Sequence, residues 1–311
     1  MILVAATGCS TAPGRLTLPA TARDRQVVLR VKVAEEGNAI RRVPLEDYVQ
    51  GTIISEVAPP SGDEVVMQGM YEVQAIVART YAMANRRRHA SEGFDLCSTT
   101  HCQLYQPSRL KTSRWAASGR VGAARTSGVV LWHNQAPAST MFHADCGGHT
   151  SAAAHVWGGT PRPYLAAARD DDVEGVVHAA WSYAVPAADL LRVLNANTRT
   201  RVGGRIDTVK VLDRDVAGRA EMVALHGERE RLVRGEDLRA VLTRTFGART
   251  IRSTMFTVRR ERGQFVFEGR GFGHGVGLCQ AGALARIKAG VTPEAILQRY
   301  FPQTSVRSLA N

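Results

Sequence analysis

The sequence predicts a mixed α+β fold, because strand-like and helix-like patterns alternate along the 311 residues. Residues 26–33 alternate apolar and polar side chains, as a half-buried strand does. From residue 63 to about residue 88, apolar side chains recur at three- and four-residue steps, which predicts one long amphipathic helix. Hydrophobic residues make up 44% and charged residues 22%, a balance that argues against a disordered chain or a coiled coil.

Shorter elements continue this alternation. Pro44 suits the first position of a short helix, and Thr292 suits a helix cap. The Cys- and His-bearing segment 91–107 and the glycine-rich segment 269–277 are expected to be loops. Strands are expected at 127–132, 138–143, 206–212, 221–226 and 254–267, and further helices at 186–196, 235–245, 280–288 and 292–300.

The start of the chain suggests export. Met1–Cys9 is apolar and small and ends in Gly8-Cys9, like the end of a signal peptide with a lipid-acceptor cysteine. We therefore expect residues 1–23 to be a signal remnant and linker, Cys9 to be a candidate lipid anchor, and the protein to lie in the cell envelope or periplasm. A frayed N-terminus is the alternative. The apolar stretches are too short for a membrane-spanning helix.

Net charge is the one outlier of the composition. Lys and Arg total 40 against 28 Asp and Glu, a net charge of +12. Such a balance indicates an anionic partner, which can be nucleic acid, a phosphate-rich surface or an acidic polysaccharide. The chain shows no recognition helix and no interleaving of aromatic and basic residues, so we expect no nucleic-acid binding.

Four potential metal ligands lie within fourteen residues. His89, Cys97, His101 and Cys102 form a Cys2His2 set, which fills the tetrahedral coordination of zinc and would make the site structural. Two alternatives remain open from the residues alone. The cysteines can be reduced beside two surface histidines, or Cys97 and Cys102 can form a disulfide in an exported protein.

Three other segments carry candidate chemistry. Glu56 follows the apolar pair Ile53-Ile54, and burial of a carboxyl group raises its pKa toward that of a general acid; a capping or ion-paired carboxylate is the alternative. The run Gly269–Gly277 surrounds His274 with glycines that let a ligand approach the backbone. Cys146 can be a nucleophile, although a buried cysteine at a tight turn is the interpretation we favour, and Asp170-Asp171-Asp172 is expected to be a solvated loop.

The order of these motifs resembles the stage II sporulation protein D family (SpoIID, with its LytB relatives). The motifs are Val43-Pro44-Leu45-Glu46-Asp47-Tyr48-Val49, Ser55-Glu56-Val57, Gln74-Ala75-Ile76-Val77-Ala78-Arg79-Thr80-Tyr81-Ala82, Phe94–Tyr105, Cys146-Gly147-Gly148 with Thr150, and Gly271–Ala283. The resemblance covers residues 27 to 300. Among the departures, Cys279 stands where the family commonly has a serine.

This resemblance implies a lytic transglycosylase that cleaves peptidoglycan glycan strands. It implies Glu56 as the catalytic acid and base, two interleaved lobes that form one unit over residues 24–311 around a substrate groove, and structural zinc on His89, Cys97, His101 and Cys102. A non-catalytic glycan-binding protein that activates a cell-wall amidase is the alternative. The residues expected to bind substrate are Arg79, His274, Gly273, Gly275, Gln280, Tyr105 and Cys146.

Overall fold

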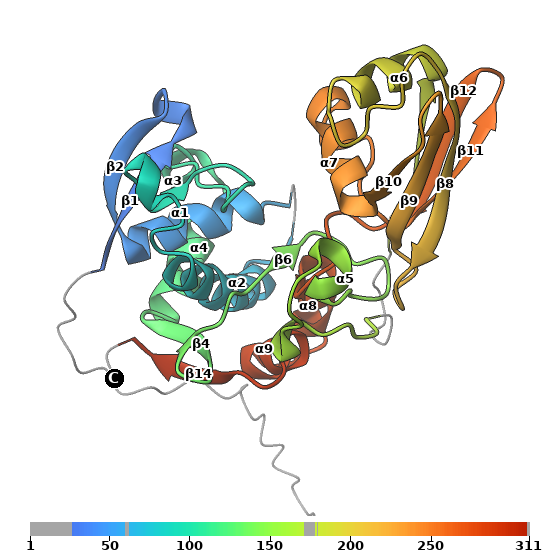
Figure 1. The fold of residues 1–311 in the computed structure, drawn as a ribbon. Helices are drawn as coiled ribbons and strands as arrows, with labels where there is room; N and C mark the ends of the chain where they lie inside the picture. Colours follow the sequence, from blue (N-terminus) through green and yellow to red (C-terminus); the bar gives the residue numbers. More distant parts are fainter. Residues whose placement is uncertain (1–26, 60–61, 171–177, 179, 310–311) are drawn as a thin grey trace, which may run out of the picture.

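The computed structural model describes residues 27–59, 62–170, 178 and 180–309. Its helices and several small sheets confirm the predicted α+β class (Figure 1). The signal remnant and the candidate anchor Cys9 lie outside the described residues. Within the described part, no helix combines the length and the apolar character that crossing a bilayer requires.

The first part of the chain forms a small three-stranded sheet and a helical layer. Its elements are β1 (Val28–Val33), β2 (Ala39–Pro44), α1 (Leu45–Glu56), α2 (Glu64–Ala84), β3 (Leu96–Cys97), α3 (Arg109–Thr112), α4 (Ala116–Arg125), β4 (Val129–His133), β5 (Ala136–Pro137), β6 (Phe142–His143) and α5 (Ala153–Trp157), with 3-10 turns at Ala34–Glu36, Ala90–Glu92 and Pro163–Leu165. Burial alternates along β1, as predicted for a half-buried strand. Helix α2 is the predicted long helix; Asp63 caps its start by accepting a hydrogen bond from Val66 N.

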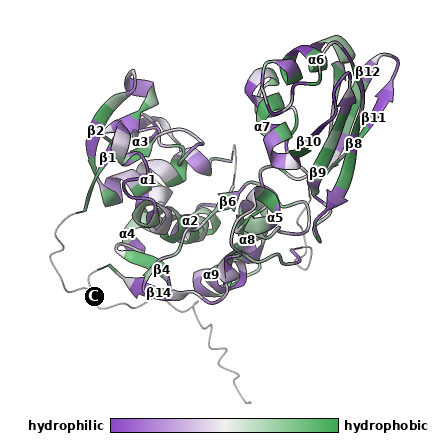
Figure 2. Ribbon diagram, viewed as in Figure 1, coloured by the Kyte–Doolittle hydropathy of each residue, from purple (hydrophilic) through white to green (hydrophobic). Residues whose placement is uncertain are grey.

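The middle part forms a separate hydrophobic core. Its elements are β7 (Ala180–Pro186), α6 (Ala187–Asn195), β8 (Ile206–Arg214), β9 (Ala220–Gly227), β10 (Arg231–Arg234), α7 (Gly235–Phe246), β11 (Phe256–Glu261) and β12 (Gln264–Arg270). They make two three-stranded antiparallel sheets, ordered β10-β9-β8 and β11-β12-β7. Figure 2 shows hydrophobic residues along β8 and β9, where this core includes Val209, Val223 and Leu225.

The C-terminal part returns to the first core. Its elements are β13 (Leu278–Cys279), α8 (Gln280–Lys288), α9 (Pro293–Tyr300) and β14 (Ser305–Ser308). Strand β13 pairs parallel with β6, and β14 pairs antiparallel with β4. Leu278 and Phe301 are therefore buried in one cluster with Val31 and Ile76. Residues that precede the middle part in the sequence and residues that follow it thus build one core.

The extent of two predicted strands was wrong. The expected strand 254–267 is a hairpin of β11 and β12, because Arg262 and Gly263 take the left-handed backbone conformation and reverse the chain. Of the expected strand 138–143 only Phe142–His143 pairs with another strand. Thr140 instead donates its hydroxyl hydrogen bond to Val77 O of α2, so this stretch packs on a helix.

Close packing of α2 on α4 depends on Gly122. A Cβ atom at this position would lie 2.6 Å from Tyr71 Cβ and 2.9 Å from the Tyr71 carbonyl carbon. Gly122→Ala should therefore lower the free energy of unfolding by about 1–3 kcal/mol, although alanine is the better helix former. Urea unfolding measures this change.

Gly69→Ala is the matched control in α2, because its Cβ would meet only the Ile287 side chain, at 3.0 Å. An equal loss in both variants would contradict the backbone clash at Gly122.

Candidate functional site

Glu56 is the last residue of α1. The helix ends there because Val57 turns extended, ahead of Pro59. The half-buried Glu56 carboxylate accepts a hydrogen bond from Leu104 N at 2.6 Å through its Oε1 atom. Burial raises the pKa of Glu56 to about 7, and the Leu104 N–H opposes this shift. The carboxyl group can thus exchange a proton near neutral pH, as a general acid and base must.

The loop that supplies Leu104 is fixed against α1 by three contacts. Gln106 N donates to Ser55 Oγ at 3.1 Å, and Tyr48 Oη donates to Gln103 Oε1 at 3.2 Å. The Tyr105 ring lies against Gly51, where a Cβ atom would come within 2.5 Å of the ring. The position of the Glu56 carboxylate therefore depends on the conformation of this loop.

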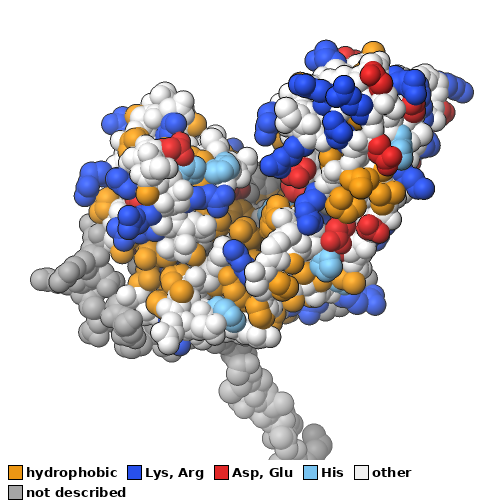
Figure 3. All heavy atoms as spheres, viewed as in Figure 1, with side chains coloured by type: hydrophobic (Ala, Val, Ile, Leu, Met, Phe, Trp, Pro, Cys, Tyr) orange, Lys and Arg blue, Asp and Glu red, His pale blue; other side chains and the backbone are white. Residues whose placement is uncertain are grey.

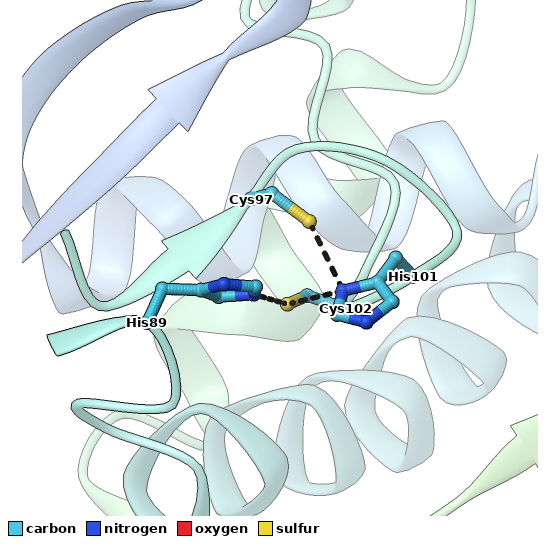
Figure 4. Close-up of side chains that lie close together, drawn as sticks. All are labelled: His89, Cys97, His101 and Cys102. Carbon is cyan, nitrogen blue, oxygen red and sulfur yellow. Dashed lines mark hydrogen bonds between the residues drawn. The ribbon is translucent and has the colours of Figure 1, made fainter. Parts of the chain in front are cut away.

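The four expected metal ligands meet at the start of the same loop (Figure 4). Cys102 Sγ lies 3.4 Å from His89 Nε2 and 3.7 Å from His101 Nδ1, and Cys97 Sγ lies 3.6 Å from His101 Nδ1. Neither sulfur is in a disulfide. Zinc with its usual bond lengths in a tetrahedral site separates sulfur and nitrogen ligands by about 3.6 Å, so these donors fit zinc.

A carboxylate orients one of these ligands. His89 Nδ1 lies 2.6 Å from Glu92 Oε1, which leaves Nε2 directed at Cys102. Carboxylates in this position commonly orient metal-binding histidines. Burial, followed by the positive charge of Arg88, lowers the pKa of His101, which keeps its imidazole neutral as metal binding requires.

Three of the expected substrate-binding residues are buried and cannot contact a substrate in this structure. Arg79 has no exposed surface, because its guanidinium donates to both carboxylate oxygens of Glu46, at 2.8 and 2.6 Å. Tyr105 is 5% exposed against Gly51, and Cys146 is fully buried with its thiol donating to Asp170 Oδ2 at 3.1 Å. In this structure the three side chains are thus engaged by other parts of the protein, and their expected contact with substrate stays a prediction.

The glycine-rich loop has one buried and one accessible part. Gly275 is buried because the Arg219 guanidinium lies against it, where a Cβ atom would come within 2.2 Å of Arg219 Nε. Gly273, His274 and Gln280 are half-buried. Gly275 is thus covered by Arg219, whereas Gly273, His274 and Gln280 keep some exposed surface.

His274 packs beside an aromatic residue that the sequence analysis missed. Trp157 is 42% exposed, and its ring centroid lies 5.0 Å from that of His274. Trp157 lines a hollow of about 470 Å³ with Met141, Ala153 and residues 158–162. The signal that could have found it is an aromatic residue followed by the pair Gly158-Gly159. Burial lowers the pKa of His274 to about 3, so its imidazole is neutral.

Asp170 also departs from its expected place. It is fully buried, with Arg286 at 2.7 Å and the Tyr300 hydroxyl at 2.8 Å from its Oδ1 atom, so it is not part of a solvated loop. Asp171 and Asp172 lie outside the described residues.

A notch separates the part of the molecule that carries α1–α3 from the part that carries α6 and α7 (Figure 3). Lys and Arg side chains gather over the latter part in the same view. A second hollow, of about 670 Å³, is lined by Arg30, Arg42, Arg86, Arg87 and Asp95 with Val27 and Val28. The surface therefore offers concave, positively charged regions to an anionic ligand.

Comparison with known proteins identifies a family domain in the first part of the chain. Residues 34–133, which contain Glu56 and the four metal-ligand candidates, match the family model of the stage II sporulation protein. The chain is also 24% identical over 282 residues to stage II sporulation protein D of Bacillus subtilis, covering 86% of this chain and 76% of that protein. Residues 34–133 thus carry a domain of the stage II sporulation protein family, and the similarity to stage II sporulation protein D spans most of the chain.

Other similarities extend this assignment. An uncharacterized protein of Brachyspira hyodysenteriae is 26% identical over 275 residues, which span 84% of this chain and 66% of that protein. A Bacillus subtilis protein named amidase enhancer is 24% identical over 284 residues, 76% of this chain and 38% of that protein. Residues 174–277, which enclose the second core, match a domain of unknown function. The chain thus combines two separately recognised segments.

The raised pKa of Glu56 predicts how the stability of this protein depends on pH. Its pKa is about 7 in the folded protein against 4.5 ordinarily, so between these values the folded state holds the proton that the unfolded state releases. Stability therefore falls as the pH rises through this window. Glu56→Gln removes the ionisation and should raise the free energy of unfolding by about 1–3 kcal/mol at pH 8, and by little at pH 4.5.

Urea unfolding at the two pH values checks this expectation. Glu36→Gln is the control, since Glu36 lies in a surface ion pair with Arg41 and should give no gain at pH 8. A Glu56→Gln protein no more stable than wild type at pH 8 would contradict burial as the cause.

Proposed function

We propose that this protein is a peptidoglycan lytic transglycosylase, which cleaves the β-1,4 bond between N-acetylmuramic acid and N-acetylglucosamine. The observation that carries the proposal is the half-buried Glu56 at the end of α1, with a pKa of about 7 and one oxygen held by Leu104 N. The stage II sporulation protein domain at residues 34–133 and the similarity to stage II sporulation protein D support a role at the cell wall.

The chemistry requires a single carboxyl group. Glu56 donates its proton to the glycosidic oxygen as the bond to the muramic anomeric carbon breaks. The C6 hydroxyl oxygen of the same muramic residue then bonds to that carbon, and its proton passes to the Glu56 carboxylate. The product is a 1,6-anhydro ring, and no water is consumed. Because the nucleophile belongs to the substrate, the second enzymic carboxylate of ordinary glycosidases is not needed.

Other residues would bind the glycan strand. Trp157 presents an exposed ring on which a sugar can pack, and His274 lies beside it as a neutral hydrogen-bonding group. The Arg-lined hollow and the net charge of +12 favour a polymer that carries muramic carboxylates or wall phosphates. We place the protein outside the cytoplasm, where this polymer lies, with Cys9 as the proposed lipid anchor.

Product analysis tests the reaction. Wild-type protein incubated with purified glycan strands should release fragments ending in 1,6-anhydro-muramic acid, detected by mass spectrometry. Glu56→Gln should lower the rate by about 100-fold or more, because it cannot transfer the proton. The wild-type rate should fall as the pH rises above about 7, where Glu56 loses its proton.

Glu36→Gln serves as the exposed control and should leave the rate unchanged. Absence of anhydro products from wild type, or an undiminished rate in Glu56→Gln, would reject the proposal.

The second candidate function is activation of a cell-wall amidase by a non-catalytic glycan-binding protein. The similarity to the protein named amidase enhancer favours it. In that case Glu56→Gln should stimulate an amidase as well as wild type does, while neither protein releases anhydro products.

We also propose that His89, Cys97, His101 and Cys102 bind one structural zinc ion. Zinc would hold the loop that ends at Leu104 and so maintain the hydrogen bond to Glu56. With four protein ligands the ion has no open position, so it serves structure only.

Removal of these ligands tests the zinc proposal. Cys97→Ser combined with Cys102→Ser should lower the zinc content by one equivalent and should reduce the melting temperature by several degrees. Elemental analysis and calorimetry measure both. Ser98→Ala, in the same loop, is the control for metal content, and an unchanged zinc content in the double variant would refute the site.

A further inference from the structure

A second cluster of metal-ligand types lies in the interior, separate from the loop cluster of His89, Cys97, His101 and Cys102. A ring nitrogen of His143 and the sulfur atoms of Cys146 and Cys279 lie within 4.8 Å of one another, and all three residues are buried. The parallel pairing of β13 with β6 sets Cys279 directly opposite His143. Cys146 then follows β6 at the turn, so residues 133 positions apart in sequence meet at one point.

His143 has a buried nitrogen without a partner. Its Nδ1 atom lies 3.1 Å from Val276 O, a carbonyl that can only accept, so Nδ1 carries the proton and Nε2 carries the lone pair. The residue is 4% exposed, and Nε2 has no hydrogen-bond partner in the described part of the chain. A buried nitrogen without a hydrogen-bond partner destabilises the folded protein. This points to a ligand that would bind the lone pair of Nε2.

The two sulfur atoms are also held in defined surroundings. Cys279 Sγ accepts hydrogen bonds from Cys146 N at 3.2 Å and from Gly282 N at 3.4 Å, at the start of α8. Backbone N–H groups and a helix N-terminus both favour negative charge on this sulfur. Cys146 lies between Asp170, whose Oδ2 accepts from its thiol, and Arg219, which donates to its carbonyl oxygen at 2.6 Å.

We propose that His143 Nε2, Cys146 Sγ and Cys279 Sγ bind a thiophilic d10 cation, either zinc or copper(I). Thiolate and imidazole ligands select these ions over hard cations such as magnesium or calcium. Binding forms two metal–sulfur bonds and one metal–nitrogen bond and releases the two thiol protons. Asp170 Oδ2, 3.1 Å from Cys146 Sγ, is the oxygen that would complete a tetrahedral set for zinc. Copper(I) would need only the three ligands.

Such an ion would join the turn after β6 to the start of α8. These two segments lie on either side of the middle part in sequence and already share the β6–β13 pairing. The metal would therefore stabilise the closure of the first core by the C-terminal part. This inference concerns structure and does not rest on the proposed glycan cleavage.

Metal content of the full chain tests the site. In a background of Cys97→Ser and Cys102→Ser, which removes the loop site, protein purified without added metal should retain one equivalent of zinc or copper. Adding Cys279→Ser should remove this equivalent, because the hydroxyl can still accept the two N–H bonds but does not hold a soft cation. Inductively coupled plasma mass spectrometry identifies which of the two metals is present.

A second variant keeps the test valid if Cys279→Ser does not fold. His143→Gln in wild-type protein should lower the total metal content by one equivalent and leave the loop site filled. Circular dichroism confirms the fold of each variant.

Three results would overturn the proposal. The first is a background protein with no bound metal and three titratable thiols, those of Cys9, Cys146 and Cys279, under denaturing conditions. The second is a mass lower by two hydrogens with a Cys146–Cys279 disulfide peptide. The third is unchanged metal content in Cys279→Ser.

Discussion

The hydrogen bond from Leu104 N to Glu56 is the interaction on which the proposed site depends. It joins the last residue of α1 to the loop that begins at the His89, Cys97, His101 and Cys102 cluster. Burial favours the protonated carboxyl group and the N–H favours the ionised one. Because these effects oppose each other, the proton affinity of Glu56 is set near neutrality by the position of one loop.

Helix α1 is fixed at both ends, which gives this carboxylate a rigid support. At its start, Glu46 pairs with the buried Arg79 of α2 and accepts a further hydrogen bond from Gly128 N. Arg79 also donates to Val129 O, so one guanidinium links α1, α2 and β4. Because Arg79 is buried, loss of Glu46 would leave the charge of its guanidinium uncompensated. The ion pair therefore restrains the start of the helix that carries Glu56.

The two cysteine clusters differ in how far apart their residues lie in the sequence. The loop cluster gathers donors that lie within fourteen residues, and two thiols and two imidazoles in so short a segment suggested a metal site. The buried cluster needs β6 and β13 to pair before its donors meet, so it can form only when the C-terminal part has closed the first core.

The sequence by itself determined the elements whose pattern is local, such as β1, the long helix α2 and the Thr292 cap of α9. With the family resemblance it also identified Glu56 and the loop cluster as candidates, although the Leu104 N–H that holds the Glu56 carboxylate comes from a distant loop. Only the tertiary structure decided that Arg79, Tyr105 and Gly275 are buried and that Trp157 is exposed. Burial depends on contacts between residues far apart in the chain, and a local pattern of residue types does not contain them.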